Sequence, residues 1–288
     1  MIAFDPRRPR GIVWLASYPK SGNTWVRAFL DALLRITRGE QVDSVDINRM
    51  DQFRRSANDV QRFEKYLSGP ADRVDRSEIA RARAQVQADI VAESEGLVLV
   101  KTHNALMPDR GAPAINLGVS AGAIYIVRNP LDVAVSFAAF VSKPLDQMID
   151  ELATPGWGSG TNAKEVYYVT GSWSENVASW TAASNPVVLV VRYEDMLDRP
   201  QEAFGAIAAH IRSGASPEQV ARAVELSSFK ALQQTEQTTG FVETPDTASL
   251  FFRAGRAGQW RDAMSEGQVR RLTASHRQQM QRFGYAQA

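Results

Sequence analysis

The residues best suited to chemistry follow the first apolar run of the chain, Ile12 to Ala16. They comprise a cation, a glycine and small side chains that donate hydrogen bonds: Lys20, Gly22, Ser21, Asn23 and Thr24. Where a strand ends and a helix begins, unpaired backbone N–H groups and the positive end of the helix dipole favour an anion. The segment from Ser17 to Trp25 therefore predicts a loop that binds a phosphate.

The order of these residues argues against a nucleoside triphosphatase. The phosphate loop of those enzymes reads G-x-x-x-x-G-K-[ST], with the lysine after the glycine. Here Lys20 precedes Gly22, and no apolar strand ending in a metal-binding aspartate accompanies the loop. The pattern favours an anion site that works without a divalent metal. For Gly22 or Thr24 taken alone, an ordinary turn with a helix cap is the simpler interpretation.

Further candidates follow later apolar runs. Lys101 and His103 come after Leu97–Val100. Arg128 follows another such run, and Ser136 comes eight positions later. A histidine, with an ordinary pKa of about 6.5, can remove the proton of an alcohol or a phenol, and an arginine fork matches a phosphate. Taken singly, such residues are more often structural, so their meaning depends on what surrounds them.

The composition excludes several other chemistries. The 288 residues contain no cysteine and three histidines, none spaced to place two imidazoles on one helical face for a metal. The 33 basic and 32 acidic residues leave a net charge of +1, so we expect no nucleic-acid partner. No apolar run approaches the roughly 18 residues that span a bilayer. We therefore expect a cytoplasmic protein with no membrane partner.

Strand-sized apolar runs alternate with helical patterns along the chain. The runs are Ile12–Ala16, Leu97–Val100, Ala123–Val127 and Val187–Val191. Apolar spacing and helix-starting prolines predict helices over Val26–Leu34, Pro130–Val141 and Pro200–Ile211. This alternation predicts an α/β fold, an open and mostly parallel sheet flanked by helices in three layers.

Two segments lie outside this alternation. From about Asp46 to Glu95 the chain is rich in charged residues and glutamine, which predicts surface helices whose charges mostly form a solvated face. Ser142 to Ser184 mixes glycine, proline and tryptophan and can cap a pocket. We expect one domain over residues 1–288, with segments 40–95 and 140–185 as caps.

Several segments, in one order, resemble the cytosolic-type sulfotransferases. Tyr18 to Trp25 reads Y-P-K-S-G-N-T-W, which is similar to that family's 5′-phosphosulfate loop except for Asn23 in place of a threonine. Tyr125 to Ser136 resembles the family's 3′-phosphate motif. Lys101-Thr102-His103 resembles the strand end that carries its catalytic histidine. The resemblance extends from about Gly11 to Gln281.

Three further segments agree with the same family. Phe252 to Trp260 resembles its R-K-G-x-x-G-D-W segment, with Ala254 and Gln259 in place of the lysine and the aspartate. Arg192 to Met196 matches its Y-E-D-M, and Ser227 to Phe229 matches the segment beside the adenine. His210 and His276 match no motif, and we interpret both as structural or surface residues.

The resemblance implies the P-loop-like sulfotransferase fold and an enzyme that uses 3′-phosphoadenosine 5′-phosphosulfate (PAPS) as co-substrate, without a metal. It implies in-line transfer of the sulfuryl group to a hydroxyl of a small-molecule acceptor, with His103 as base, Lys20 at the leaving group and Lys101 on the acceptor side. The donor contacts that it implies are Lys20, Ser21, Gly22, Asn23, Thr24, Trp25, Arg128, Ser136, Tyr193, Ser227, Phe229, Arg253, Ala254 and Gly255. Arg256 is our candidate to replace the charge missing at Ala254.

Some alternatives stay open at this point. A P-loop kinase-like phosphotransferase would share the strand, loop and helix but need Mg²⁺ and ATP. A nucleotide-binding protein without catalysis would keep the pocket alone. The acceptor can be a phenol, sterol, aliphatic alcohol, sugar, peptide or lipid. The family's dimer segment, K-x-x-x-T-V-x-x-x-E, is not found in Arg261–Gln281, so monomer and homodimer both remain possible.

Overall fold

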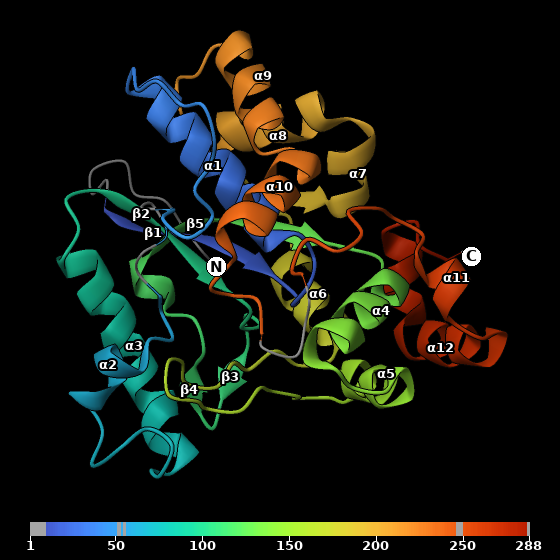
Figure 1. Cartoon of the computed structure of the whole chain (residues 1–288). Coiled ribbons are helices and arrows are strands. Elements are labelled where there is room, and N and C mark those ends of the chain that lie inside the picture. Colours follow the sequence, from blue (N-terminus) through green and yellow to red (C-terminus); the bar gives the residue numbers. More distant parts are fainter. Residues whose placement is uncertain (1–9, 51–52, 54–55, 246–249, 287–288) are drawn as a thin grey trace. The chain divides into compact units, whose positions relative to one another are not determined.

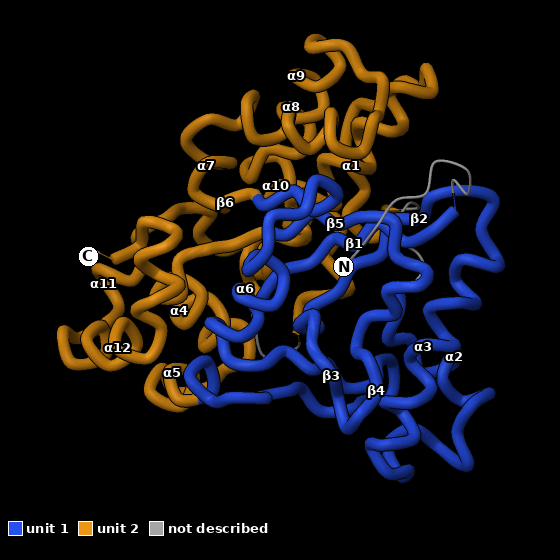
Figure 2. The backbone as a smooth tube through the Cα atoms, turned by 180° about the vertical axis from the view of Figure 1, so that it is seen from behind, with its two compact units in different colours: residues 1–18, 55–125, 151–190 blue, residues 19–54, 126–150, 191–288 orange. Residues whose placement is uncertain are grey.

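The computed structural model describes residues 10–50, 53, 56–245 and 250–286. The chain divides into two compact units, coloured separately in Figure 2. Unit 1 comprises residues 1–18, 55–125 and 151–190, and unit 2 comprises residues 19–54, 126–150 and 191–288. Each unit is built from segments far apart in the sequence.

A four-stranded sheet has the order β2-β1-β5-β6 (Figure 1). Its strands are β1 (Gly11–Ser17), β2 (Leu97–Thr102), β5 (Ser120–Val127) and β6 (Val188–Arg192). Every residue of β1 and β5 is buried, as continuous apolar runs predict, whereas β2 alternates because it lies at the edge of the sheet. The sheet is mostly parallel and flanked by helices, which confirms the predicted fold class.

The pairing of β1 with β2 positions two polar loops. The strands run parallel, in a register that pairs Gly11 with Leu97 and Ala16 with Thr102. Both strands therefore end at the same edge of the sheet. Ser17, the last residue of β1, and His103, which follows β2, meet at the carboxyl end, where open α/β sheets place ligands.

The rest of unit 1 surrounds the sheet with helices and a small hairpin. These elements are α2 (Val60–Glu64), α3 (Arg76–Ala92), β3 (Pro108–Asp109), β4 (Ala112–Pro113), the 3₁₀ helix η2 (Leu117–Val119) and α6 (Trp173–Thr181). The expected surface helices are present as α2 and α3. One face of α3 is nevertheless buried, with Ile79, Val86 and Ile90, and this face also buries the charged Arg83 completely. The expectation of a solvated charged face is therefore wrong for Arg83, whose guanidinium finds partners inside the fold.

Unit 2 is mainly helical. Its elements are α1 (Asn23–Thr37), α4 (Pro130–Val141), α5 (Leu145–Ala153, which continues into unit 1), α7 (Tyr193–Asp198), α8 (Pro200–His210), α9 (Pro217–Leu226), α10 (Phe229–Thr239), α11 (Trp260–Ala263) and α12 (Glu266–Arg282). The bounds of α4 match the prediction, because Pro130 fills the first helical position and Asn129 caps the Leu131 N–H. Helices α1 and α9 pack side by side (Figure 1).

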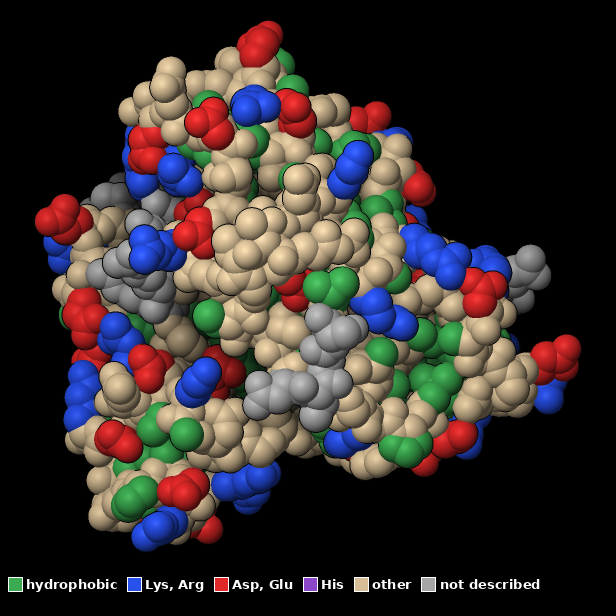
Figure 3. Space-filling model, in the orientation of Figure 1, with side chains coloured by type: hydrophobic (Ala, Val, Ile, Leu, Met, Phe, Trp, Pro, Cys, Tyr) green, Lys and Arg blue, Asp and Glu red, His purple; other side chains and the backbone are tan. Residues whose placement is uncertain are grey.

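Basic and acidic side chains are interspersed on the face drawn in Figure 3. This agrees with the net charge of +1. Among the described residues, every helix is too short or too polar to cross a bilayer.

Candidate functional site

The loop before α1 has a backbone that few residue types tolerate. Lys20 has a φ of 65°, in the left-handed region that is costly for a residue with a Cβ. Gly22 has a φ of 100°, and a Cβ there would lie 2.7 Å from Cδ2 of Tyr193. Glycine is thus required at position 22 both by conformation and by the approach of the tyrosine ring. Such strained backbone persists where the surrounding structure holds it, often at functional sites.

The start of α1 presents donors that the described residues do not use. The N-cap is Gly22, and no side-chain hydrogen bond caps the helix there. The N-terminus of a helix favours an anion. Close by in the chain, the Ser21 hydroxyl and the Trp25 indole Nε1 are buried without a hydrogen-bond partner among those residues. Buried polar groups are rarely left unpaired. The loop therefore has the chemistry to receive a ligand rich in acceptor oxygens.

Arg128 links this loop to two other segments of unit 2. Its Nη1 donates to the carbonyl oxygen of Lys20 at 2.9 Å, and its Nη2 donates to the carbonyl oxygen of Arg256 at 3.3 Å. Its guanidinium lies over the Tyr193 ring, 4.1 Å from the centroid. The Nε is buried and has no partner among the described residues. Arg128 thus joins the segments that the sequence assigned to the two ends of one nucleotide.

The C-terminal segment is fastened to α4 through one buried carboxylate. Asp132 accepts hydrogen bonds from the backbone N–H of Gly258 at 2.7 Å and of Trp260 at 3.1 Å. Gln259, at the place of the family's aspartate, accepts a bond from Arg253 Nη2 at 3.2 Å. These contacts hold Arg253 in the same unit as Arg128.

Gly255 is the second glycine that the site requires. Its φ is 57°, and a Cβ there would lie 2.3 Å from the ring of Phe229, at the start of α10. The neighbouring Ala254 is exposed. Arg256 is exposed as well, and its guanidinium pairs with Asp262 at 2.7 Å. In this structure Arg256 contributes its carbonyl oxygen to the Arg128 contact, while its side chain is engaged elsewhere.

Two of the three aromatic residues assigned to the adenine, Trp25 and Tyr193, lie near one another at the start of α1 and α7. Trp25 meets Tyr193 edge to face, with the ring centroids 5.8 Å apart, and also packs on Phe204 at 5.3 Å. Burial raises the pKa of the Tyr193 phenol. Ser227 is completely buried, and its hydroxyl donates to the Ala223 carbonyl at 2.8 Å, which satisfies it within the chain.

The remaining predicted donor residues lie on α1 and α4. Asn23 and Thr24 begin α1 and are both buried. The Thr24 hydroxyl accepts a bond from Arg27 at 3.0 Å, and Arg27 pairs with Glu243 at 2.7 Å. Ser136 lies in α4, half-buried. All of the predicted donor residues, from Lys20 to Gly255, therefore belong to unit 2.

His103 belongs to unit 1 and has a defined tautomer. Its Nδ1 lies 2.8 Å from the carbonyl oxygen of Ser17 and 3.4 Å from the Ser17 hydroxyl. A carbonyl oxygen only accepts, so Nδ1 carries the proton and Nε2 keeps the lone pair of a base. Lys101 lies two residues earlier in β2, half-buried.

Tyr168 forms an aromatic wall beside this histidine. The two rings have centroids 5.5 Å apart and are tilted by 58°. The Tyr168 hydroxyl donates to Glu165 at 2.9 Å, which fixes the ring. Sequence reasoning did not single out Tyr168, because nothing in its spacing connects it with position 103.

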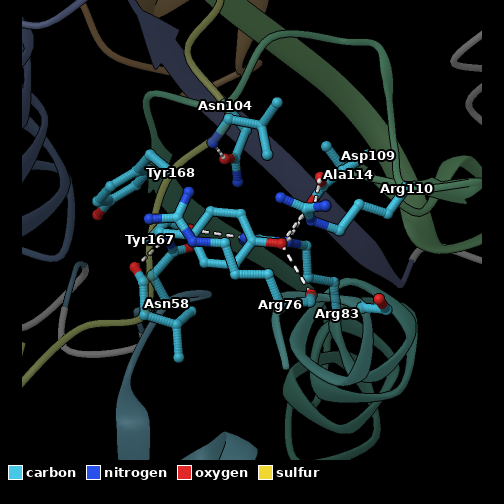
Figure 4. A network of polar contacts seen from close by, with 12 residues as sticks. Asn58, Arg76, Arg83, Asn104, Asp109, Arg110, Ala114, Tyr167 and Tyr168 are labelled. Atoms are coloured by element: carbon cyan, nitrogen blue, oxygen red, sulfur yellow. Dashed lines mark hydrogen bonds and ion pairs between the residues drawn. The ribbon is translucent and has the colours of Figure 1, made fainter. Parts of the chain in front are cut away.

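A buried polar network holds the chain next to Tyr168 (Figure 4). The ring of Tyr167 lies between the guanidinium groups of Arg76 and Arg83, 4.7 and 4.5 Å from its centroid. Its hydroxyl donates to Asp109 at 2.5 Å, and Arg83 donates to the Tyr167 carbonyl at 2.6 Å. The Asn58 amide adds a bond to that carbonyl at 3.3 Å. The network gives Arg83 its partners, although burial still lowers its pKa.

We also searched the described part of the chain for side chains that could bind a metal ion. There, no cluster of three or more histidine, cysteine, aspartate or glutamate side chains is suited to hold an ion.

Comparison with known proteins places the chain in a family. The family model of the sulfotransferase domain matches residues 11–284. Sulfotransferase 1A1 of Canis lupus familiaris is 27% identical over 280 residues, which is 94% of this chain and 83% of the relative. Sulfotransferase 1E1 of Mus musculus is 26% identical over 284 residues, which is 95% of this chain and 84% of the relative.

Solved structures show the same fold. Mouse sulfotransferase SULT7A1, complexed with PAP, aligns with a TM-score of 0.61 and 19% identity over 96% of this chain and 85% of its own. Retinol dehydratase, in complex with androsterone and the inactive cofactor PAP, aligns with a TM-score of 0.58 and 20% identity over 96% and 82%. The chain belongs to the sulfotransferase domain family, and this membership confirms the predicted enzyme class, a PAPS-dependent sulfotransferase.

Proposed function

We propose that this sulfotransferase moves the sulfuryl group of PAPS to a hydroxyl of a small-molecule acceptor, and that unit 2 holds the donor. The observation that carries the proposal is a set of buried donors that have no partner among the described residues, namely Ser21 Oγ, Trp25 Nε1 and Arg128 Nε. They belong to segments that Arg128 links, and a nucleotide with two separate anionic ends fits that set. Two relatives of known structure were solved with PAP, the nucleotide that remains after the transfer.

The donor contacts divide by the part of the nucleotide that each serves. In this proposal the 5′ end lies on the loop, against the side chains and N–H groups of Lys20, Ser21, Gly22, Asn23, Thr24 and Trp25. The 3′-phosphate takes hydrogen bonds from Arg128, Ser136, Arg253 and the backbone of Ala254 and Gly255. The adenine lies among Trp25, Tyr193, Ser227 and Phe229. Arg256 strengthens the 3′ contact only if it leaves Asp262.

The catalytic roles follow from charge and proton flow. PAPS, when bound, supplies an activated sulfuryl group on its 5′-phosphate. His103 Nε2 takes the proton of the acceptor hydroxyl as that oxygen bonds to sulfur. Lys20 stabilises the negative charge that the 5′-phosphate oxygen gains as its bond to sulfur breaks, a contribution typically worth about 2.7–4 kcal/mol. Lys101 steadies the acceptor side.

The acceptor side draws on unit 1 in this proposal. Tyr168 beside His103 supplies one wall of the acceptor pocket. Segments 40–95 and 140–185 cap the pocket, and the cytoplasm is the compartment that we propose from the resemblance to cytosolic-type enzymes. Transfer needs no divalent metal, so a chelator leaves its rate unchanged.

The test begins with the nucleotide. Thermal unfolding is followed with PAP or with ATP and Mg²⁺, because a ligand of the folded state raises its stability by mass action. PAP alone is expected to stabilise the protein. A preference for ATP and Mg²⁺ favours the kinase-like alternative and contradicts the proposal.

The second step measures transfer. Labelled PAPS is offered with a panel of phenols, sterols, aliphatic alcohols and sugars, and products are identified by mass spectrometry. We expect a sulfated hydroxyl compound, and a loss of turnover of about 100-fold or more for Lys20→Met and for His103→Ala. Wild-type turnover in either variant would refute that residue's role. PAP binding without transfer to any acceptor would favour a non-catalytic nucleotide-binding protein.

A further inference from the structure

The Lys20 ammonium lies against two aromatic rings from different segments of unit 2. Its Nζ is 3.8 Å from the ring centroid of Phe140, near the end of α4, and 3.9 Å from that of Phe251, after α10. The two rings are nearly perpendicular, at 88°, with centroids 5.6 Å apart. An aromatic face attracts a cation at this distance through its quadrupole. Phe140 and Phe251 together form an aromatic clamp around the ammonium.

A buried carboxylate fixes one half of the clamp. Glu236 in α10 accepts the backbone N–H of Phe251 at 2.6 Å and of Phe252 at 2.9 Å, and the Thr244 hydroxyl at 2.7 Å. Glu236 is only 4% exposed, so these bonds are shielded from water. Phe241 also packs edge to face on Phe251, with centroids 5.0 Å apart. Phe251 is therefore held through its backbone N–H by Glu236 and through its ring by Phe241.

The other end of the lysine is fixed as well. Its carbonyl oxygen accepts the Arg128 bond at 2.9 Å, and its φ of 65° leaves the backbone little room. A lysine stem is long and flexible, and holding its ammonium at one point costs much conformational entropy. Lys20 has both its backbone and its charge held before any nucleotide arrives.

We propose that Phe140 and Phe251 are positioning residues, which keep the Lys20 ammonium ordered for the oxygen that leaves sulfur. The inference rests on the role proposed for Lys20. Because the clamp acts through the lysine, its loss lowers the rate of transfer rather than the affinity for the nucleotide. A ring face is what the lysine needs, so tyrosine at either position preserves the effect and leucine does not.

The kinetic test uses Phe140→Leu and Phe251→Leu, each beside its Phe→Tyr counterpart. The rate is measured with labelled PAPS and the hydroxyl compound that gave the highest turnover in the acceptor panel, and the Kd of PAP is measured by calorimetry. We expect kcat to fall about 3- to 30-fold in the leucine variants, the range from an exposed to a desolvated cation–π contact, with the Kd of PAP within about twofold. The tyrosine variants recover most of the rate. Phe283→Leu, which removes a ring 5.2 Å from the Arg282 guanidinium, is the matched control and keeps wild-type turnover.

A second readout needs no turnover. The ε-methylene protons of Lys20 are assigned by NMR from the signal that is lost in Lys20→Met. Ring currents shift this signal upfield in the wild type and in the tyrosine variants, and the shift falls in Phe140→Leu or Phe251→Leu. Phe140 is half-buried in α4, so its leucine variant carries the test alone if Phe251→Leu does not fold.

The outcomes separate this inference from the proposed function. Wild-type turnover in Lys20→Met would overturn both. If Lys20→Met is inactive while both leucine variants keep their rate and the shifted signal, only the clamp is refuted. A raised Kd of PAP with unchanged kcat would make the two rings donor contacts and would also overturn the inference.

Discussion

Removal of one buried hydroxyl, in Tyr167→Phe, tests how strongly the polar network of unit 1 stabilises the fold. The hydroxyl donates to Asp109 at 2.5 Å and lies 3.0 Å from the Arg76 carbonyl oxygen, and the tyrosine is 2% exposed. A hydrogen bond to a charged group contributes about 1.5–3 kcal/mol, and removing the donor leaves the carboxylate poorly solvated. We expect the free energy of unfolding to fall by about 1.5–3 kcal/mol, a large part of the roughly 5–15 kcal/mol that folded proteins possess.

The chain offers a matched control for this substitution. Tyr66 donates to Asp89 at 2.7 Å, the same pair of groups, at an exposed position in the same unit. Urea denaturation followed by circular dichroism gives the free energy of unfolding of Tyr167→Phe, Tyr66→Phe and the wild type. Tyr66→Phe is expected to lose much less, and the Kd of PAP, whose contacts we propose in unit 2, stays within about twofold in both variants. An equal loss in the two variants would refute the argument that burial makes the network strong.

Two further predictions concern unit 2. Gly22→Ala places a Cβ 2.7 Å from the Tyr193 ring at a φ of 100°. We expect the Kd of PAP, measured by calorimetry, to rise about 5- to 150-fold, equivalent to about 1–3 kcal/mol of strain. The control is Gly39→Ala, at a φ of 81° with no described atom within 4 Å of its Cβ, which leaves that Kd unchanged. His276 is 1% exposed, and burial lowers its pKa to about 4. Since the unfolded state then binds the proton more tightly, its contribution to stability is complete above about pH 6.5 and is lost as the pH falls toward 4, by about 3 kcal/mol. Unfolding free energies measured at several pH values are expected to decline less steeply in His276→Gln, and an identical decline would contradict this origin.

The sequence predicted the elements whose signals are local. Pro130 at the first helical position and the capping Asn129 set the start of α4, and both residues are adjacent in the chain. The four apolar runs became the strands of the sheet. Two of them, β1 and β5, are buried throughout, as a continuous apolar sequence predicts. The residues predicted to bind the donor all lie in one unit.

Contacts between distant segments escaped sequence reasoning. Arg83 reads as one more charge in a polar helix, and only the fold brings Tyr167, 84 positions later, against its guanidinium. The same is true of Lys20, whose ring partners come from α4 and from the segment after α10. No spacing rule connects such positions, since their contact depends on how helices and loops pack.

The hydrogen bonds of Arg128 have a practical consequence for enzyme redesign. Both of its hydrogen-bond acceptors are main-chain carbonyl oxygens, of Lys20 and of Arg256. Every amino acid supplies such an oxygen, whatever its side chain. Replacing the side chain at position 20 or 256 with a neutral one removes a charge but keeps the carbonyl oxygen that Arg128 binds. A library that varies position 256 can therefore change the local charge while both hydrogen bonds of Arg128 are kept, whereas replacement of Arg128 itself removes both of them.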